Sequence, residues 1–151
     1  MGLHVMVVSK VVPVTNGGYP YYSLPGMEDR LEGLAADRLD GECVYDFSAG
    51  SYGGYGDWRA LLCRVMNGVE PWTVWNNSDK WKHTPFYGLI NFADNEGCIG
   101  PVWSKRLAEE FENGRLRFAQ HPDVDQYSLD LYDKWSKAFE LAADGGFVRF
   151  C

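Results

Sequence analysis

The chain has 151 residues and a formal net charge of −7 at pH 7, with a pI near 4.9. This length fits one domain with a substantial hydrophobic core, and we predict a single domain over residues 1–151. An acidic chain of this kind is not expected to bind a nucleic-acid polymer or an anionic membrane.

The first predicted elements are a strand, an aromatic loop, a short helix and a second strand. β-Branched residues favour a strand over Leu3–Val14, which Pro13 ends or confines to a sheet edge. The following loop, Thr15–Pro25, is rich in Gly, Pro and Tyr and is expected either to cover a pocket or to pack on itself. Apolar spacing then predicts a helix over Met27–Leu39, and alternation predicts a strand over Glu42–Phe47.

The middle of the chain is predicted to hold a helix, a long connection and a third strand. Apolar residues recur at helical spacing over Asp57–Met66, which indicates a helix that faces the core. No periodicity is visible over Asn67–Pro85, where three tryptophans occur, and a connection of this length is commonly a functional or covering loop. The apolar run Phe86–Phe92 is predicted to be a strand.

Two helices and a strand are predicted for the last third. The first helix is expected over Pro101–Phe111, with Asn113 and Gly114 ending it. Asp123 or Asp125 is expected to cap a longer helix that runs to about residue 144. The segment Phe147–Cys151 is predicted to be a final strand.

These elements predict an α+β fold: a single small mixed sheet of about four strands, with helices packed mainly on one face. Two loops are each predicted to leave the carboxyl end of a strand. If those strands are parallel neighbours, the loops meet at one sheet edge, which is where open α/β sheets usually bind ligands.

The first of these loops lies within Phe47–Arg59, FSAGSYGGYGDWR. Its glycines allow positive φ, so consecutive N–H groups can face one anion at the start of a helix near Gly56 or Asp57. The alternative is a tight turn capped by Asp57. Arg59 is expected to pair with a phosphate or carboxylate, or to neutralise a nearby acid. The candidate ligand-binding residues are Ser48, Gly50, Ser51, Tyr52, Gly53, Gly54, Tyr55 and Arg59.

The second loop lies within Ile90–Trp103 and carries Asp94, Asn95 and Glu96. We add these three to the candidate ligand-binding residues, because carboxylates on a turn can accept hydrogen bonds from ribose or sugar hydroxyls. They can also act as general acid and base, or only cap the turn. Asp94, Glu96 and His83 are therefore reserve catalytic candidates.

No metal site or cofactor is predicted. The cysteines at positions 43, 63, 98 and 151 are widely spread and form no CxxC pair. The N-terminus has no signal-peptide pattern, and no apolar stretch is long enough to cross a bilayer. We therefore expect a cytoplasmic protein with free thiols.

The segments FSAGSYGGY, from Phe47 to Tyr55, and NFADNEGCIG, from Asn91 to Gly100, resemble a family of short bacterial and phage-borne proteins of unknown role. The likeness covers roughly Cys43 to Phe111 and the closing helix. It carries no established activity, so it implies no catalytic residue. It implies a phage or prophage setting and thus the host cytoplasm. By analogy, small proteins in that setting include sponges that sequester nucleotide signals of host immunity.

The leading hypothesis is a protein that binds a small polar ligand of nucleotide or sugar type without turnover. The first alternative is a small hydrolase that uses Asp94 or Glu96 as acid or base, assisted by His83 or His121. The second is an inhibitor that blocks another protein, with exposed tryptophans as anchors. All three hypotheses are compatible with a homo-oligomer.

Overall fold

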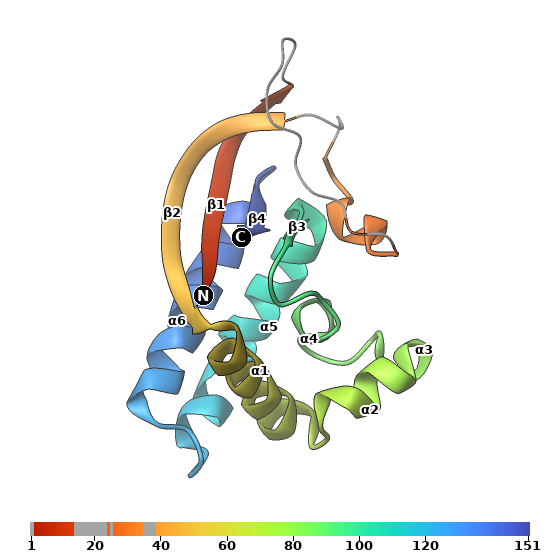
Figure 1. The fold of residues 1–151 in the computed structure, drawn as a ribbon, viewed down its shortest axis with the longest axis vertical. Helices are drawn as coiled ribbons and strands as arrows, with labels where there is room; N and C mark the ends of the chain where they lie inside the picture. The colour runs from red at the N-terminus through yellow and green to blue at the C-terminus, as the bar shows by residue number, and fades with distance from the viewer. Residues whose placement is uncertain (1, 14–23, 25, 35–38) are drawn as a thin grey trace.

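The computed structural model describes residues 2–13, 24, 26–34 and 39–151, and its strands form one sheet in the order β2-β1-β4-β3 (Figure 1). The strands are β1 (Gly2–Pro13), β2 (Leu39–Ser51), β3 (Gly97–Ile99) and β4 (Phe147–Phe150). Neighbouring strands pair antiparallel at all three positions, where a mixed sheet was expected. The predicted α+β class with one four-stranded sheet is confirmed.

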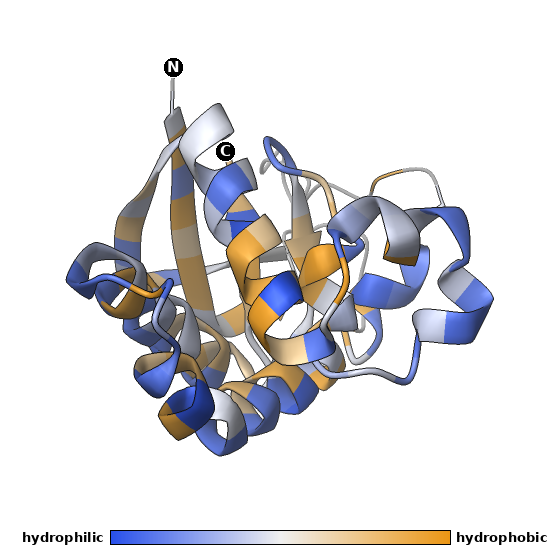
Figure 2. Ribbon diagram, turned by 90° about the horizontal axis from the view of Figure 1, so that it is seen from below, coloured by the Kyte–Doolittle hydropathy of each residue, from blue (hydrophilic) through white to orange (hydrophobic). Residues whose placement is uncertain are grey.

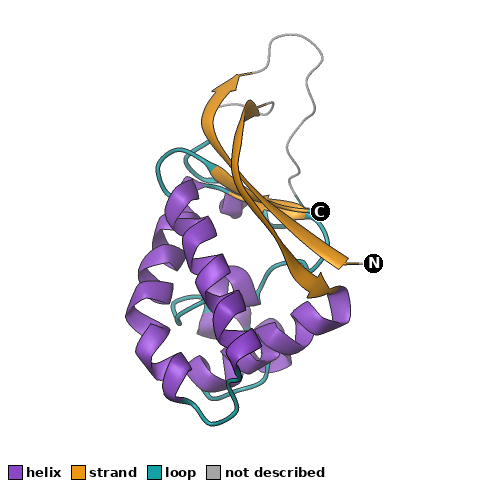
Figure 3. Ribbon diagram, turned by 90° about the vertical axis from the view of Figure 1, so that its left-hand side faces the viewer, coloured by secondary structure: helices purple, strands orange, loops and turns teal. Residues whose placement is uncertain are grey.

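The helices pack mainly against one face of this sheet, as predicted (Figure 3). They are η1 (Glu28–Leu31), α1 (Tyr52–Asn67), α2 (Pro71–Asn76), α3 (Ser78–Trp81), α4 (Tyr87–Ile90), α5 (Pro101–Gln120) and α6 (Gln126–Ala142). In β1 the side chains of Leu3, Val5 and Val7 are buried beneath the helices, whereas His4 is exposed. Apolar segments accordingly gather toward the middle of the molecule (Figure 2).

The prediction of a glycine loop after the second strand is wrong, because β2 continues to Ser51 and α1 begins at the next residue. Ser51 caps the helix, and its Oγ accepts a hydrogen bond from the N–H of Gly54 at 2.9 Å. Asp57 lies within the helix and is not its cap. Of the four glycines in this segment, Gly50 alone has a positive φ, +90°.

Replacing Gly56 with alanine should therefore stabilise the protein by about 0.5–1 kcal/mol, because glycine is a poor residue inside a helix. A Cβ at this position would meet nothing within 4 Å. Urea unfolding of the two proteins measures the difference. Gly50→Ala is the matched contrast and should destabilise, because its φ is positive and the Tyr127 hydroxyl lies 3.0 Å from the new Cβ. A loss of stability in Gly56→Ala would contradict the helical assignment.

The predicted strand Phe86–Phe92 is also wrong. These residues form the short buried helix α4 after a turn in which Phe86 has a φ of +67°. A short apolar run has the same composition in a buried strand and in a buried helical turn, so periodicity does not separate them. The third strand of the sheet is instead β3, which starts at Gly97.

Three other boundaries differ from the prediction. The helix expected over Met27–Leu39 is limited to η1 in the described residues, because Gly33 takes a φ of +93° and β2 already begins at Leu39. The connection after α1 contains α2 and α3. α5 passes through Gly114, where a Cβ would lie 2.6 Å from the Met66 methyl group. The predicted aromatic loop 15–25 lies outside the described residues, except for Leu24.

The last helix and strand match the prediction. The carboxylate of Asp125 caps α6 by accepting a hydrogen bond from the Ser128 N–H at 2.8 Å. The strand β4 follows and pairs with both β1 and β3. Among the described residues, no helix is both long enough and apolar enough to cross a membrane.

The cysteines should divide into two reactivity classes. Cys43 and Cys151 are exposed, whereas Cys63 and Cys98 are buried. Burial also raises the pKa of the Cys63 thiol to about 11, which lowers its thiolate fraction. We expect a thiol reagent at pH 8 to label the first two rapidly and the other two only after unfolding. Rapid labelling of a third thiol in the folded protein would contradict this packing.

Candidate functional site

Most of the residues predicted in the first segment have structural partners. Ser48, Ser51, Gly53 and Gly54 are exposed, and Tyr52 is half-buried. The Oγ atom of Ser48 accepts a hydrogen bond from the Gly50 N–H at 3.2 Å, and the Oγ atom of Ser51 is used as the helix cap. These hydroxyl groups therefore stabilise the junction between β2 and α1.

Tyr55 and Arg59 bring this segment into contact with the second predicted loop. Both side chains are buried, and Nη1 of Arg59 donates a hydrogen bond to the carbonyl of Phe92. Burial raises the pKa of the Tyr55 hydroxyl, Arg59 acts against that shift, and the charge of Asp94 adds to it. Asn95 and Glu96 are exposed on the same turn.

Two buried arginines and the partly exposed Trp75 donate hydrogen bonds that hold the segment joining α4 to this turn. The acceptors are the carbonyls of Gly88, Ile90, Asn91 and Phe92. Arg30 donates to Gly88 through Nε at 3.3 Å and to Asn91 through Nη2 at 3.2 Å. Trp75 donates to Ile90 through Nε1 at 2.9 Å, and Arg59 donates to Phe92. Carbonyls at the end of a buried helix need such partners.

A cleft lies beside this segment and has a volume of about 290 Å³. We call it the cationic cleft, and it is lined by Asp29, Lys82, His83, Tyr87, Trp103 and Arg106. Of this set, only His83 was predicted from the sequence to be a candidate site residue. The lining residues come from η1, from the turn after α3, from α4 and from α5, so no local motif connects them.

Two arginines hold the aromatic wall of the cationic cleft. The guanidinium of Arg30 lies 4.3 Å from the ring centroid of Trp103, and that of Arg106 lies 4.7 Å from it. Arg106 also donates hydrogen bonds to the carbonyls of Lys82 at 3.0 Å and Thr84 at 3.3 Å. These contacts fix Trp103 and Arg106 in the cleft wall.

The charge in the cationic cleft is opposite in sign to that of the whole chain. Asp29 is paired with Arg30, and Arg106 lies 3.6 Å from the carboxylate of Glu110. Burial raises the pKa of Glu110, and Arg106 partly opposes the shift. Lys82 is exposed and forms no ion pair with any described residue. The cleft therefore offers Lys82 as an unneutralised cation beside two aromatic side chains.

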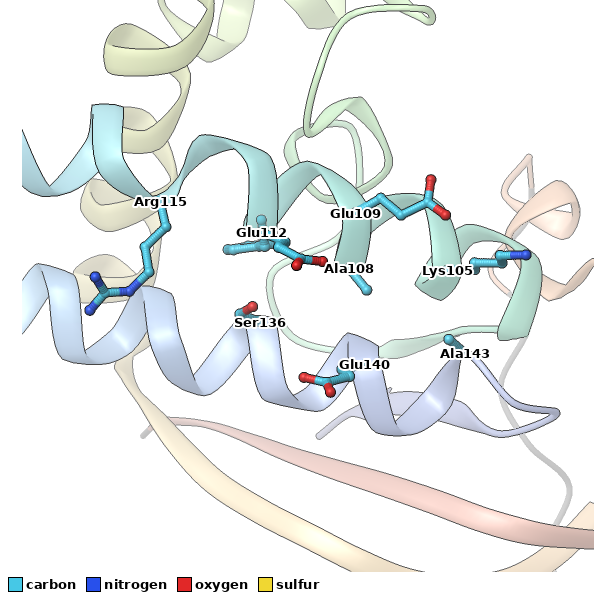
Figure 4. A pocket seen from close by; sticks show the side chains of 9 residues that line it. Lys105, Ala108, Glu109, Glu112, Arg115, Ser136, Glu140 and Ala143 are labelled. Carbon is cyan, nitrogen blue, oxygen red and sulfur yellow. The ribbon is translucent and has the colours of Figure 1, made fainter.

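Two other hollows are less suited to an anion. A groove of about 390 Å³ runs between α5 and α6, where the side chains of Glu112 and Glu140 lie between the helices (Figure 4). Arg115 lines the same groove but forms a two-point ion pair with Asp133 at 2.8 and 2.9 Å. The second hollow, of about 340 Å³, includes Gly54 and two aspartates. Among the described residues no group of three potential ligands could hold a metal ion.

No protein-family model matches the chain, and comparisons with curated proteins and with solved structures also give no match.

Proposed function

We propose that the protein binds a small ligand that carries both a ring and an anionic group, of the nucleotide class, in the cationic cleft and releases it unchanged. The observation that carries this proposal is the convergence of Lys82, His83 and Arg106 with Tyr87 and Trp103 in one cleft of a chain with a net charge of −7. Aromatic and cationic groups together are typical of sites for such ligands.

The lining residues suggest how the ligand would be held. Lys82 would contact the anionic group as a mobile point charge, and Arg106 would add a fixed guanidinium. Tyr87 and Trp103 would bury part of the ring. A volume of about 290 Å³ is near the lower end of the usual range for ligand pockets, about 300–1,000 Å³. One mononucleotide would therefore fit better than a dinucleotide.

Calorimetry against nucleoside monophosphates, cyclic nucleotides and ADP-ribose tests the proposal. We expect one class to bind and to be recovered chemically unaltered. Lys82→Ala should weaken that binding by about tenfold or more, which corresponds to about 1.4 kcal/mol. Lys80→Ala is the matched control, because Lys80 is also exposed on the same segment but does not line the cleft. A panel without any binder, or equal affinities for the two variants, would overturn the proposal.

By binding the ligand without turnover, the protein would lower the concentration of free ligand. In a phage or prophage setting this would be the role of a sponge for a host nucleotide signal. Chromatography of ligands retained after purification from a natural extract tests that role. We expect a phosphorylated ring compound, and conversion of the compound on incubation would instead favour a hydrolase.

A second candidate function rests on two tryptophans of α2. Trp72 is 58% exposed and Trp75 is 46% exposed, and α2 lies far from β1 and β2 (Figure 1). Exposed tryptophans are common anchors in protein interfaces. As an inhibitor of another protein, the chain would capture one specific host protein in a pull-down and lose it in Trp72→Ala. Capture that is unaffected by Trp72→Ala would exclude this role for α2.

A further inference from the structure

We infer that a second, internal site for a small inorganic anion lies between α1 and the turn 91–96, with Arg59 Nε and the Tyr55 hydroxyl as its donors. This site shares no residue with the lining of the cationic cleft. It is therefore independent of the function proposed above. Its ligand class follows from the two unpartnered donors, their burial and the charge of Arg59.

Two buried donors without partners mark the position. Tyr55 is 0% exposed and Arg59 is 6% exposed. They lie one turn apart on α1, and the guanidinium is 5.4 Å from the Tyr55 ring centroid. Neither the Tyr55 hydroxyl nor Nε of Arg59 has a hydrogen-bond partner among the described residues. Buried polar groups are almost always hydrogen-bonded, so these two donors call for an acceptor.

The charge balance indicates that the acceptor is an anion. Arg59 is a buried cation that forms no ion pair with any described residue, and a buried charge normally requires a counter-charge. Its Nη1 atom is occupied by the Phe92 carbonyl, and the rings of Tyr55 and Trp75 compensate only part of the charge. A single anion that accepts from Nε and from the phenol would supply the remaining compensation.

Asp94 is an acidic residue of the turn 91–96 whose charge raises the pKa of the Tyr55 hydroxyl. It is half-buried, and its charge acts on Tyr55, but it forms no ion pair with Arg59. Its negative charge should therefore oppose a bound anion without replacing it. The turn that carries it has no regular secondary structure between Phe92 and Glu96.

Thermal unfolding measured at increasing chloride concentration tests the inference. Chloride is the probe, and it replaces methanesulfonate so that the ionic strength stays constant. An anion that binds only the folded protein raises the unfolding midpoint in a saturable way. We expect chloride to raise the midpoint of the natural protein by about 2–4 °C, a typical shift for about 1 kcal/mol in a domain of this size. The same titration in Tyr55→Phe should give no chloride-dependent shift.

Tyr55→Phe keeps the ring in the core and removes only the hydroxyl group, so the variant should fold. Tyr52→Phe is the matched control on the same helix and should keep the full chloride response. Asp94→Asn should make the response larger, because it removes the opposing charge. Equal responses in all four proteins, or no response in the natural protein, would overturn the inference. A natural protein without response, together with strong destabilisation by Asp94→Asn, would assign the counter-charge to Asp94 itself.

Discussion

Replacing Trp135 with alanine should lower the free energy of unfolding by about 3–5 kcal/mol, as for other large aromatic side chains removed from cores. Trp135 is fully buried on α6. Its ring centroid lies 5.2 Å from that of Phe47 on β2, 5.3 Å from Phe150 on β4 and 5.4 Å from Tyr55 on α1. The side chain therefore joins two strands and two helices, and its loss would leave a cavity shared by all of them.

Urea unfolding measures this effect, and Trp135→Phe provides a smaller truncation that should still be folded. Trp72→Ala is the matched control, because the same residue type is removed from an exposed position. We expect the control to change stability by no more than about 0.5 kcal/mol. A Trp135→Ala cost below about 1 kcal/mol would contradict the central position of this side chain in the core.

Gly88→Ala should destabilise the protein by about 1–3 kcal/mol, the usual cost of overpacking a core. It should also abolish ligand binding in the cationic cleft. A Cβ at Gly88 would lie 2.6 Å from Cε3 and 3.0 Å from Cζ3 of Trp103. Trp103 cannot easily move away, because Arg30 and Arg106 both pack on its ring. The added methyl group should therefore shift the wall of the cleft.

Circular dichroism melting and calorimetry on the same samples separate the two effects. Gly53→Ala is the matched control, since a Cβ there would meet nothing within 4 Å, and it should bind ligand normally. Tight binding in a destabilised Gly88→Ala protein would show that Trp103 does not form the ligand contact. Unchanged stability would contradict the close packing of α4 against α5.

The elements that the sequence predicts well have strong local signals. α6 shows a continuous apolar stripe, a capping residue at Asp125 and glycines after its end, so both its existence and its start are readable. β1 and β4 are rich in β-branched or aromatic residues. The fold class follows from these elements, because their order and type leave few alternatives.

The errors occur where tertiary packing overrides local preference. Glycines at three positions of the first turns of α1 predict a loop, but the Ser51 cap and the buried side chains of Trp58 and Leu62 hold them in a helix. α4 looks like a strand because all its residues are apolar and buried. No pattern indicates that Arg30 is buried, since that depends on carbonyls about 60 residues away.

The candidate site was predictable only in part for the same reason. The two predicted segments are in contact, because Arg59 donates a hydrogen bond to the carbonyl of Phe92, 33 residues away. The residues of the cationic cleft come from four separate elements and carry no shared motif. Basic residues scattered through an acidic sequence show no local cluster, and only the fold gathers them.

The position of β4 between β1 and β3 has a consequence for how the protein is made. The main-chain N–H of His4 donates to the carbonyl of Cys151 at 2.7 Å, and the N–H of Cys151 donates to the carbonyl of His4 at 2.9 Å. On the ribosome, β1 is therefore synthesised well before β4, the strand with which it pairs. Such long-range pairing slows folding, so during synthesis one edge of β1 stays open to chaperones or to other nascent chains.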